Sequence, residues 1–139
     1  MTAPDSSQRV CWLHSTADSP RVLQAVAGAM AAAGYIEDDV FAVCLGLNEA
    51  LLNAVLHGNG GDPAKQARVS YQVTAEQVLA EVEDEGPGFN PDKVPDPRAP
   101  ENLERLGGRG LLLMRSYLTW VRYNPQGNGV VLCKCRSAP

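Results

Sequence analysis

The sequence predicts an α+β fold, a two-layer sandwich in which helices cover one face of a mixed or antiparallel sheet. Hydrophobic periodicity gives the element order β-α-α-β-β-loop-α-β-β. Four of the strands come as two pairs joined by short turns, which favours antiparallel neighbours with one packed face. The chain has 139 residues, of which 45% are hydrophobic and 20% charged, so we expect one domain over residues 1–139 around a single core.

The first quarter of the chain predicts a strand followed by a helix. Residues 9–15 alternate in the manner of a strand. Ser19 and Pro20 then predict a helix N-cap followed by proline at the first helical position. The helix expected over residues 21–33 is rich in alanine and has apolar residues at helical spacing, and Gly34 ends it.

The second helix is the stretch on which the functional prediction depends. It is expected from the acidic residues 37–39, which suit the positive end of the helix dipole, to His57. It is apolar nearly all round except for Glu49, Asn53 and His57, which recur every four residues and therefore share a face. A carboxylate and an amide there need a polar partner. That partner is another part of the protein, ordered water or a ligand with a cation.

Two strand pairs and a long loop make up the rest of the chain. The first pair is expected over residues 68–74 and 78–84, and the second over residues 119–123 and 130–134. Between the pairs, residues 91–100 contain four prolines that exclude a regular element, so residues 86–107 are expected to form a lid loop.

An apolar helix over residues 111–118 is expected to follow the loop. The two tryptophans, Trp12 and Trp120, belong either to the core or to an interface, and we favour the core.

Composition excludes several classes of function. The formal net charge of −4 and the pI near 5.1 argue against direct binding of nucleic acid. No apolar run approaches the roughly 18 to 20 residues that span a bilayer, and the first residues lack the pattern of a signal peptide. We therefore expect a cytoplasmic protein without a membrane partner. The four cysteines do not suggest a disulfide framework.

Three short motifs carry chemistry. Glu49 is placed to polarise an attacking hydroxyl or water, and the amide oxygen of Asn53 suits Mg²⁺, which prefers few protein ligands. Asp84 at a strand end can accept a hydrogen bond from an exocyclic amine, and Gly86 and Gly88 leave room for a flat ring. Taken alone, this second motif is often only a turn after a strand.

The third motif consists of glycines ahead of the last helix. Gly108 and Gly110 let backbone amides approach an anion at a helix N-terminus, which suits nucleotide phosphates. Arg109 adds charge there, although a solvated lid arginine is the alternative. The P-loop pattern is absent, so a P-loop nucleotide site is excluded.

In this order and spacing, E-x-x-x-N-A-x-x-H-G, D-x-G-x-G-F and G-G-x-G-L resemble the N, G1 and G2 boxes of the GHKL ATPase superfamily. With its short length, the chain is similar to the anti-sigma factor serine/threonine kinases of the RsbW/SpoIIAB type. The resemblance implies the Bergerat ATP-binding fold, the cofactors ATP and Mg²⁺, and a protein kinase. It also implies Glu49 as general base, Asn53 as Mg²⁺ ligand and Asp84 as reader of the adenine amino group. The other nucleotide-binding residues that it implies, which shape the pocket and lid, are Gly86, Gly88, Gly108, Arg109, Gly110 and Leu111.

The resemblance also implies partners. Members of the family bind a sigma factor, phosphorylate a small STAS-domain antagonist of the anti-sigma factor, and commonly act as homodimers. One departure concerns the last strand, residues 130–134, which has no Ser or Thr where relatives often place a hydroxyl near the adenine. Cys133 and its neighbours therefore put nucleotide affinity in question. The alternative function is a nucleotide-dependent protein-binding regulator with little or no kinase activity.

Overall fold

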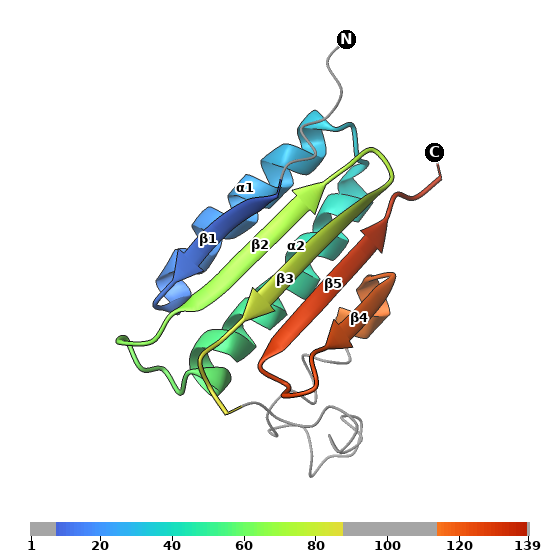
Figure 1. Cartoon of the computed structure of the whole chain (residues 1–139). Coiled ribbons are helices and arrows are strands. Elements are labelled where there is room, and N and C mark those ends of the chain that lie inside the picture. The colour runs from blue at the N-terminus through green and yellow to red at the C-terminus, as the bar shows by residue number, and fades with distance from the viewer. Residues whose placement is uncertain (1–7, 88–113, 139) are drawn as a thin grey trace, which may run out of the picture.

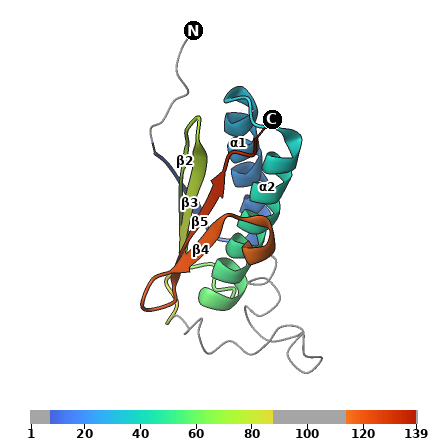
Figure 2. The ribbon, with the colours of Figure 1, turned by 90° about the vertical axis from the view of Figure 1, so that its right-hand side faces the viewer.

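The computed structural model describes residues 8–87 and 114–138. They form a five-stranded sheet in the order β1-β2-β3-β5-β4, and every neighbouring pair is antiparallel (Figure 1). The helices α1 and α2 lie on one face of this sheet (Figure 2). The predicted two-layer α+β class is confirmed, with an antiparallel sheet. In chain order the elements are β1 (Arg9–Leu13), α1 (Ser19–Ala32), α2 (Glu37–Leu52), β2 (Ala67–Val73), β3 (Gln77–Glu83), β4 (Trp120–Tyr123) and β5 (Gly129–Cys135).

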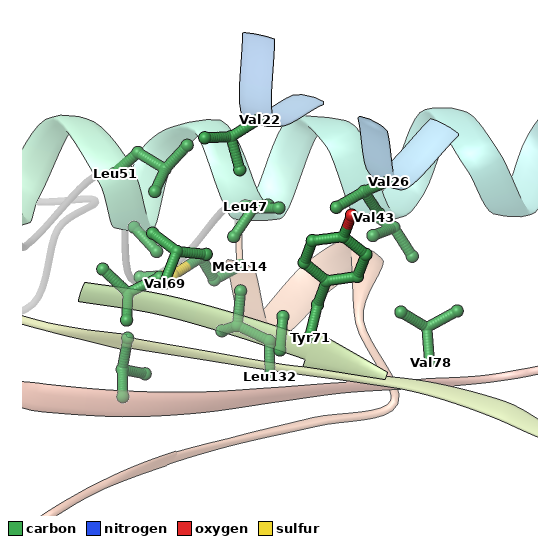
Figure 3. Close-up of a cluster of buried hydrophobic side chains, with 14 of the residues drawn as sticks. Val22, Val26, Val43, Leu47, Leu51, Val69, Tyr71, Val78, Met114 and Leu132 are labelled. Carbon is green, nitrogen blue, oxygen red and sulfur yellow. The ribbon is translucent and has the colours of Figure 1, made fainter. Parts of the chain in front are cut away.

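The core lies between the helices and the inner face of the sheet (Figure 3). Because strand residues alternate between faces, every second residue of each strand meets the helices. The largest fully buried side chains of this core come from β1, both helices and the segment after the loop: Leu13, Met30, Leu47, Leu51 and Met114. Residues 114–117 are helical, as predicted for this part of the chain. Gly46 of α2 allows this short helix to come close, because a Cβ there would lie 2.6 Å from Leu118 Cδ1.

The start of α1 differs from the sequence prediction. Ser19 is the first residue of the helix rather than its cap, and its buried hydroxyl has no hydrogen-bond partner within the described ranges. The capping serine is Ser15, which precedes a 3-10 turn over Thr16–Asp18. The Ser15 hydroxyl accepts from the Ala17 amide, while the Asp18 carboxylate accepts from the Ser15 amide. The extra turn satisfies the free amides before α1 begins, so the cap moves four residues toward the N-terminus.

The end of α1 offers a test of the helix itself. Gly28 is exposed in α1, and a Cβ added there would meet no atom within 4 Å. Because glycine weakens a helix interior, Gly28→Ala should raise the free energy of unfolding by about 0.5–1 kcal/mol. In Gly34→Ala, the matched control, the left-handed φ of 83° should make the same change destabilising. Urea unfolding of both variants measures the two effects, and a Gly28→Ala variant weaker than the wild type would contradict the assignment.

The second helix covers the residues that the sequence predicted, from Glu37 to Gly58, but its last turn has a different geometry. It continues past α2 into a π-helical turn, Asn53–Gly58, whose wider hydrogen bonding is seen where the Asn59 amide donates to the Ala54 carbonyl at 2.8 Å. Together they form a helix of 22 residues that contains an 18-residue window with a mean hydropathy of 1.6, which is long and apolar enough by composition to span a membrane. The expectation that no run approaches this length was therefore wrong. In the fold this helix packs on α1 and the sheet and gives the core Val43, Leu47, Ala50, Leu51, Ala54 and Val55, while Phe41 and Leu56 are exposed.

Asp39 was expected only to interact with the helix dipole, but it also binds residues at the end of the chain. Its side chain is only 1% exposed, and it accepts hydrogen bonds from the backbone amide and the hydroxyl of Ser137, with Lys134 Nζ 3.7 Å away. Desolvation raises the pKa of Asp39, but the Ser137 hydrogen bonds and the Lys134 charge outweigh it and hold the pKa below its ordinary value. The segment after β5 is thereby tied to the start of α2.

This arrangement makes stability depend on pH through Asp39. A carboxyl whose pKa is lowered by folding stabilises the fold above its unfolded pKa of about 3.9, and the contribution disappears as pH falls through the folded pKa. Asp39→Asn should therefore lower the free energy of unfolding at pH 7 by about 2–3 kcal/mol, with a smaller difference at pH 3. Urea titrations at both pH values measure this. Asp38→Asn, an exposed neighbour, should change stability by less than about 0.5 kcal/mol. An equal loss for both variants would contradict the role of Asp39.

Arg136, like Ser137, ties the segment after β5 to the region between α1 and α2. Its guanidinium donates to the carbonyls of Ala33, Gly34 and Ala75, and it stacks over the Tyr35 ring at 4.6 Å. The turn between α1 and α2 is thus joined to the β2–β3 hairpin.

The two tryptophans do not lie in the core on the helix side of the sheet. Trp12 is 47% exposed and projects from the sheet face opposite the helices, so its expected core position was wrong. Trp120 is half-buried on that same face, with the Arg122 guanidinium 4.5 Å above its ring. The prediction failed because an alternating strand pattern does not say which of its two faces receives the helices.

Candidate functional site

A cavity of about 120 Å³, open to solvent, lies at the end of the sheet where α2 and the π-helical turn meet β3 and β5. Its walls are mostly apolar, with a few polar groups that could fix the orientation of a ligand. The lining residues are Ala50, Asn53, Ala54, His57, Gly58, Val82, Asp84, Pro87, Tyr123, Gly127, Asn128, Gly129 and Val130.

The helical wall carries the polar stripe that the sequence singled out. Asn53 and His57 both line the cavity, whereas Glu49 is half-buried one helical turn earlier and is not among the lining residues. The Asn53 amide still donates to the Glu49 carbonyl, so the α-helical relation between these two residues is intact. The π-helical turn begins at Asn53, and four of its six residues, Asn53, Ala54, His57 and Gly58, line the cavity. Such turns occur often at functional sites.

The opposite wall carries Asp84, which follows directly after β3. One of its carboxylate oxygens accepts from the Gly86 amide at 2.7 Å, and the side chain lines the cavity. Desolvation raises the pKa of Asp84 above its ordinary value, although the Gly86 hydrogen bond and the charge of Lys65 act in the opposite direction. A half-buried carboxylate with a raised pKa in a cavity is a candidate binding group, because a ligand donor would offset its desolvation.

Two glycines allow this wall to come close to the helix. A Cβ on Gly86 would lie 1.8 Å from the carbonyl oxygen of Gly58, and a Cβ on Gly58 would lie 2.2 Å from the Asp84 carboxylate. No side chain fits at either position without moving backbone or the carboxylate. Gly86 was predicted to make room beside a ligand; its described contacts show that it makes room for the helix end.

Side chains on both sides hold the turn that carries Asp84. The Asn59 side-chain oxygen accepts from the Glu85 amide at 2.7 Å, and Asn59 is only 4% exposed. Glu85 in turn accepts from the Gln66 amide at 2.7 Å. On the other side the Asp84 amide donates to the Asn128 carbonyl at 2.8 Å. The position of Asp84 is therefore fixed by three separate parts of the chain.

The hairpin between β4 and β5 supplies a third wall that the sequence prediction missed. Tyr123, Asn128 and Val130 line the cavity from it, while Asn124 accepts from the amides of Gly127 and Asn128 and so shapes the turn. Burial raises the pKa of Tyr123 to about 12. The sequence showed only turn residues here, because nothing local indicates that this turn closes against Asp84.

The position of Cys133 in β5 keeps its side chain away from the cavity. Cys133 is fully buried on the sheet face away from the cavity, where its thiol contacts the Gln77 side-chain oxygen. The residue of β5 that lines the cavity is Val130. The missing hydroxyl therefore concerns Val130 rather than Cys133: no hydroxyl lies on this strand at the cavity, and the side chain there is valine.

Several predicted site residues lie outside the described residues: Gly88, Gly108, Arg109, Gly110 and Leu111. The predicted lid over residues 86–107 likewise falls outside them from residue 88 onward. Of the residues predicted to form the site, the described ranges bring together Asn53, Asp84 and Gly86, with Glu49 one turn away.

The donor set fits Mg²⁺ only if a ligand supplies most of the oxygens. Within residues 8–87 and 114–138 no group of three or more His, Cys, Asp or Glu side chains could hold a metal ion. Asn53 offers one amide oxygen at the cavity, and Mg²⁺ characteristically combines one or two protein ligands with phosphate oxygens and water. Asn53 therefore suits a magnesium ion that arrives with a nucleotide.

Comparison with known proteins places the chain in a wider context. Residues 14–134 match the family model described as the histidine kinase-like ATPase domain. No curated protein matches the chain. Among solved structures, the crystal structure of the RsbU and RsbW domains of Rv1364c from Mycobacterium tuberculosis is similar, with a TM-score of 0.61 and 17% sequence identity. The match covers 94% of this chain and 33% of that chain, so this chain spans about one third of that protein's length. At this identity the likeness shows a shared fold.

Proposed function

Since this chain belongs to the histidine kinase-like ATPase domain family, which binds ATP, we propose that it is an ATP- and Mg²⁺-dependent serine/threonine protein kinase that acts as an anti-sigma regulatory factor. The observation that carries the proposal is the cavity that is lined by both Asp84, after β3, and Asn53, at the end of α2. One wall offers an acceptor for a base, and the other offers an oxygen for a metal–phosphate group.

The residues act in the following way in this proposal. The Asp84 carboxylate accepts a hydrogen bond from the adenine amino group, and apolar side chains such as Val82 and Val130 pack against the ring. Asn53 holds Mg²⁺ together with phosphate oxygens. Glu49 accepts the proton of the attacking Ser or Thr hydroxyl as its oxygen bonds to the γ-phosphorus and ADP departs. ATP supplies the phosphoryl group.

The proposed partners follow from the family resemblance and from the RsbW domain named in the similar structure. The phosphoryl acceptor is a STAS-domain antagonist, and the second partner is a sigma factor that the protein sequesters. We further propose a homodimer in the cytoplasm, with no membrane or nucleic-acid partner. The acidic pI near 5.1 supports the last point.

One observation favours a second function. Glu49 is not among the residues that line the cavity, whereas Asn53 and Asp84 are. A protein that binds the nucleotide but does not position the base would be a nucleotide-dependent binding regulator with little or no kinase activity.

The experiment combines a thermal shift with phosphoryl transfer. The full chain is melted with Mg²⁺ and ATP, with GTP as the control nucleotide, and γ-labelled ATP is then added with a STAS-domain protein encoded beside it. A shift with ATP and label on the partner supports the kinase. A shift without label favours the binding regulator. No shift with ATP would contradict both functions, because each requires the nucleotide.

A further inference from the structure

Two of the four cysteines lie together on the sheet face opposite the helices, which neither α1 nor α2 covers (Figure 2). Because strand residues alternate between faces, Cys133 and Cys135 of β5 point to the same side. The strand registers pair Cys133 with Trp120 of β4 and with Leu79 of β3. Both thiols are free, and neither cysteine lines the nucleotide cavity.

One of these two thiols is buried and the other is open to solvent. Cys133 is 0% exposed, and its thiol donates to the Gln77 side-chain oxygen at 3.6 Å, whereas Cys135 is exposed at the end of β5. Burial, followed by the charge of Cys135 and a hydrogen bond with it, raises the pKa of Cys133 to about 11. The two sulfur atoms are therefore close enough to interact, and a ligand that reaches Cys135 from solvent meets Cys133 next to it.

The backbone that carries both thiols is held on its two sides. The Thr119 amide donates to the Cys133 carbonyl at 2.8 Å, and the Thr119 hydroxyl accepts from the Cys135 amide at 2.8 Å. On the other side, β3 pairs Gln77 with Cys135 and Leu79 with Cys133. The two side chains therefore keep the spacing of a regular strand, in which residues two apart are separated by about 6.6 Å.

This spacing decides between the two reactions that a pair of thiols commonly undergoes. A disulfide needs its two Cβ atoms about 3.5–4.5 Å apart, so it would require β5 to leave its hydrogen bonds. A metal ion with metal–sulfur bonds of about 2.3 Å holds two sulfur atoms about 4.6 Å apart. Side chains that lean toward each other from neighbouring positions on one strand face can reach that separation. The pair therefore suits a bridging metal ion better than a disulfide.

The number and the kind of ligands select the metal. Thiolates prefer soft ions such as Cu⁺ and Zn²⁺. Structural zinc takes four ligands, and iron–sulfur clusters take four cysteines. Within residues 8–87 and 114–138, however, no group of three or more His, Cys, Asp or Glu side chains could hold a metal ion. Monovalent copper, the softest of these ions, forms stable complexes with two thiolates alone.

The surroundings of the pair also suit Cu⁺. One Cu⁺ ion between two thiolates leaves a net charge of −1. The positive charge of Arg122, which lies on the same face, acts to lower the pKa of Cys133 and so favours the thiolate that a metal needs. The Arg122 guanidinium lies 4.5 Å from the ring of Trp120, the residue that pairs with Cys133. Because Cys133 is buried, water is kept from one side of a bound ion.

From these observations we infer that Cys133 and Cys135 form a binding site for one Cu⁺ ion on the sheet face opposite the helices. The ion enters at the exposed Cys135 and is held between the two sulfur atoms, and the proton of the Cys133 thiol passes to solvent as its sulfur binds the metal. The residues of β5 that line the nucleotide cavity are Gly129 and Val130, so the two sites are separate. Copper binding therefore requires neither ATP nor a protein partner.

The first experiment titrates the full chain with Cu⁺, added without oxygen as its acetonitrile complex, in competition with the coloured chelator bicinchoninate. We expect one tightly bound Cu⁺ per chain, and far weaker binding of Zn²⁺, because zinc would find only two protein ligands. Trp120 reports the location, since it pairs with Cys133, and its emission should fall in step with copper binding. Trp120→Phe should still bind Cu⁺, and the remaining emission, from Trp12, should not change.

The second experiment removes the ligands one at a time. Cys135→Ser should weaken Cu⁺ binding more than about 100-fold, because loss of a group that only supports a metal ligand already costs about 10–100-fold in affinity. Since Cys135 is exposed, this variant should fold normally. Cys133→Ala tests the second ligand, with far-UV dichroism as the check on folding. The matched controls are Cys11→Ser, on the helix-facing side of β1, and Cys44→Ser, on α2, and both should keep the wild-type affinity.

Four results would overturn the copper site. They are a wild-type chain that takes no Cu⁺ from bicinchoninate, a Cys135→Ser variant with the wild-type affinity, an equal loss of affinity in the two control variants, and binding of Zn²⁺ as tight as that of Cu⁺. The ATP-induced thermal shift is measured separately on each variant without copper. A chain that shows this shift but binds no Cu⁺ would contradict the copper site and leave the proposed nucleotide function standing.

Discussion

Glu49→Ala should abolish phosphoryl transfer to the STAS-domain partner while ATP still stabilises the fold against heat. A general base in contact with the reacting hydroxyl contributes about 10²- to 10⁴-fold to the rate. Glu49 is half-buried on α2 and lies outside the lining of the cavity, so its removal should take little nucleotide-binding energy with it. The initial rate of label transfer measures the first effect, and the ATP-induced rise in Tm measures the second.

Glu37→Ala is the control for this experiment, because it removes an exposed carboxylate from the other end of the same helix. It should leave the transfer rate within about twofold. If Glu49→Ala transfers phosphate at the wild-type rate, Glu49 is not the base. If it loses the ATP-induced shift as well, the residue acts in binding rather than in proton transfer.

Asp84→Asn should weaken ATP binding roughly 100-fold without weakening the fold. Asparagine keeps the size and one acceptor oxygen, so the hydrogen bond from the Gly86 amide survives. The other oxygen becomes an amide group, which cannot accept from an adenine amine, and hydrogen bonds to charged groups are worth about 1.5–3 kcal/mol. At a concentration of about 100 times the wild-type Kd, ATP stabilises the wild type by about 2.7 kcal/mol and should stabilise this variant by only about 0.4 kcal/mol.

The second part of the prediction concerns the stability of Asp84→Asn in the absence of nucleotide. Because burial raises the pKa of Asp84, its charged form opposes folding as pH rises through the folded pKa, and asparagine removes this unfavourable term. Asp84→Asn should therefore be at least as stable as the wild type at pH 7 in the absence of ATP. Asp62→Asn, in the exposed loop after the π-helical turn, should change neither quantity. An unaltered ATP shift in Asp84→Asn would remove the adenine assignment.

Much of the fold could be predicted because each element carries its own periodic signal. The π-helical turn could not be predicted, because its wider hydrogen bonding leaves the apolar pattern of the helix unchanged. Asp39 could not be predicted either, since its partner Ser137 lies 98 residues away in the sequence. Trp12 shows a third limit: alternation fixes which residues share a face but not which face meets the helices.

For the candidate site, the motifs found the residues whose chemistry is local. Asn53 and Asp84 were singled out from sequence, and both line the cavity. Tyr123 and Asn128 were missed because a turn sequence does not reveal what it packs against. Cys133 was linked to the ligand by its strand alone, although its side chain points to the other side of the sheet. The variants Glu49→Ala and Asp84→Asn test whether these two residues act as predicted.

The order in which the walls of the cavity are synthesised has a consequence for co-translational folding. Its walls come from residues 50–58, 82–87 and 123–130, and the last wall enters the sheet only when β5 pairs with β3. Until the last hairpin has been synthesised, a nascent chain has no complete nucleotide site, so ATP cannot stabilise it. During the same interval the edge of β3 is unpaired and open to wrong partners. We therefore expect wrong strand pairing to be most frequent late in translation, just before the nucleotide site is complete.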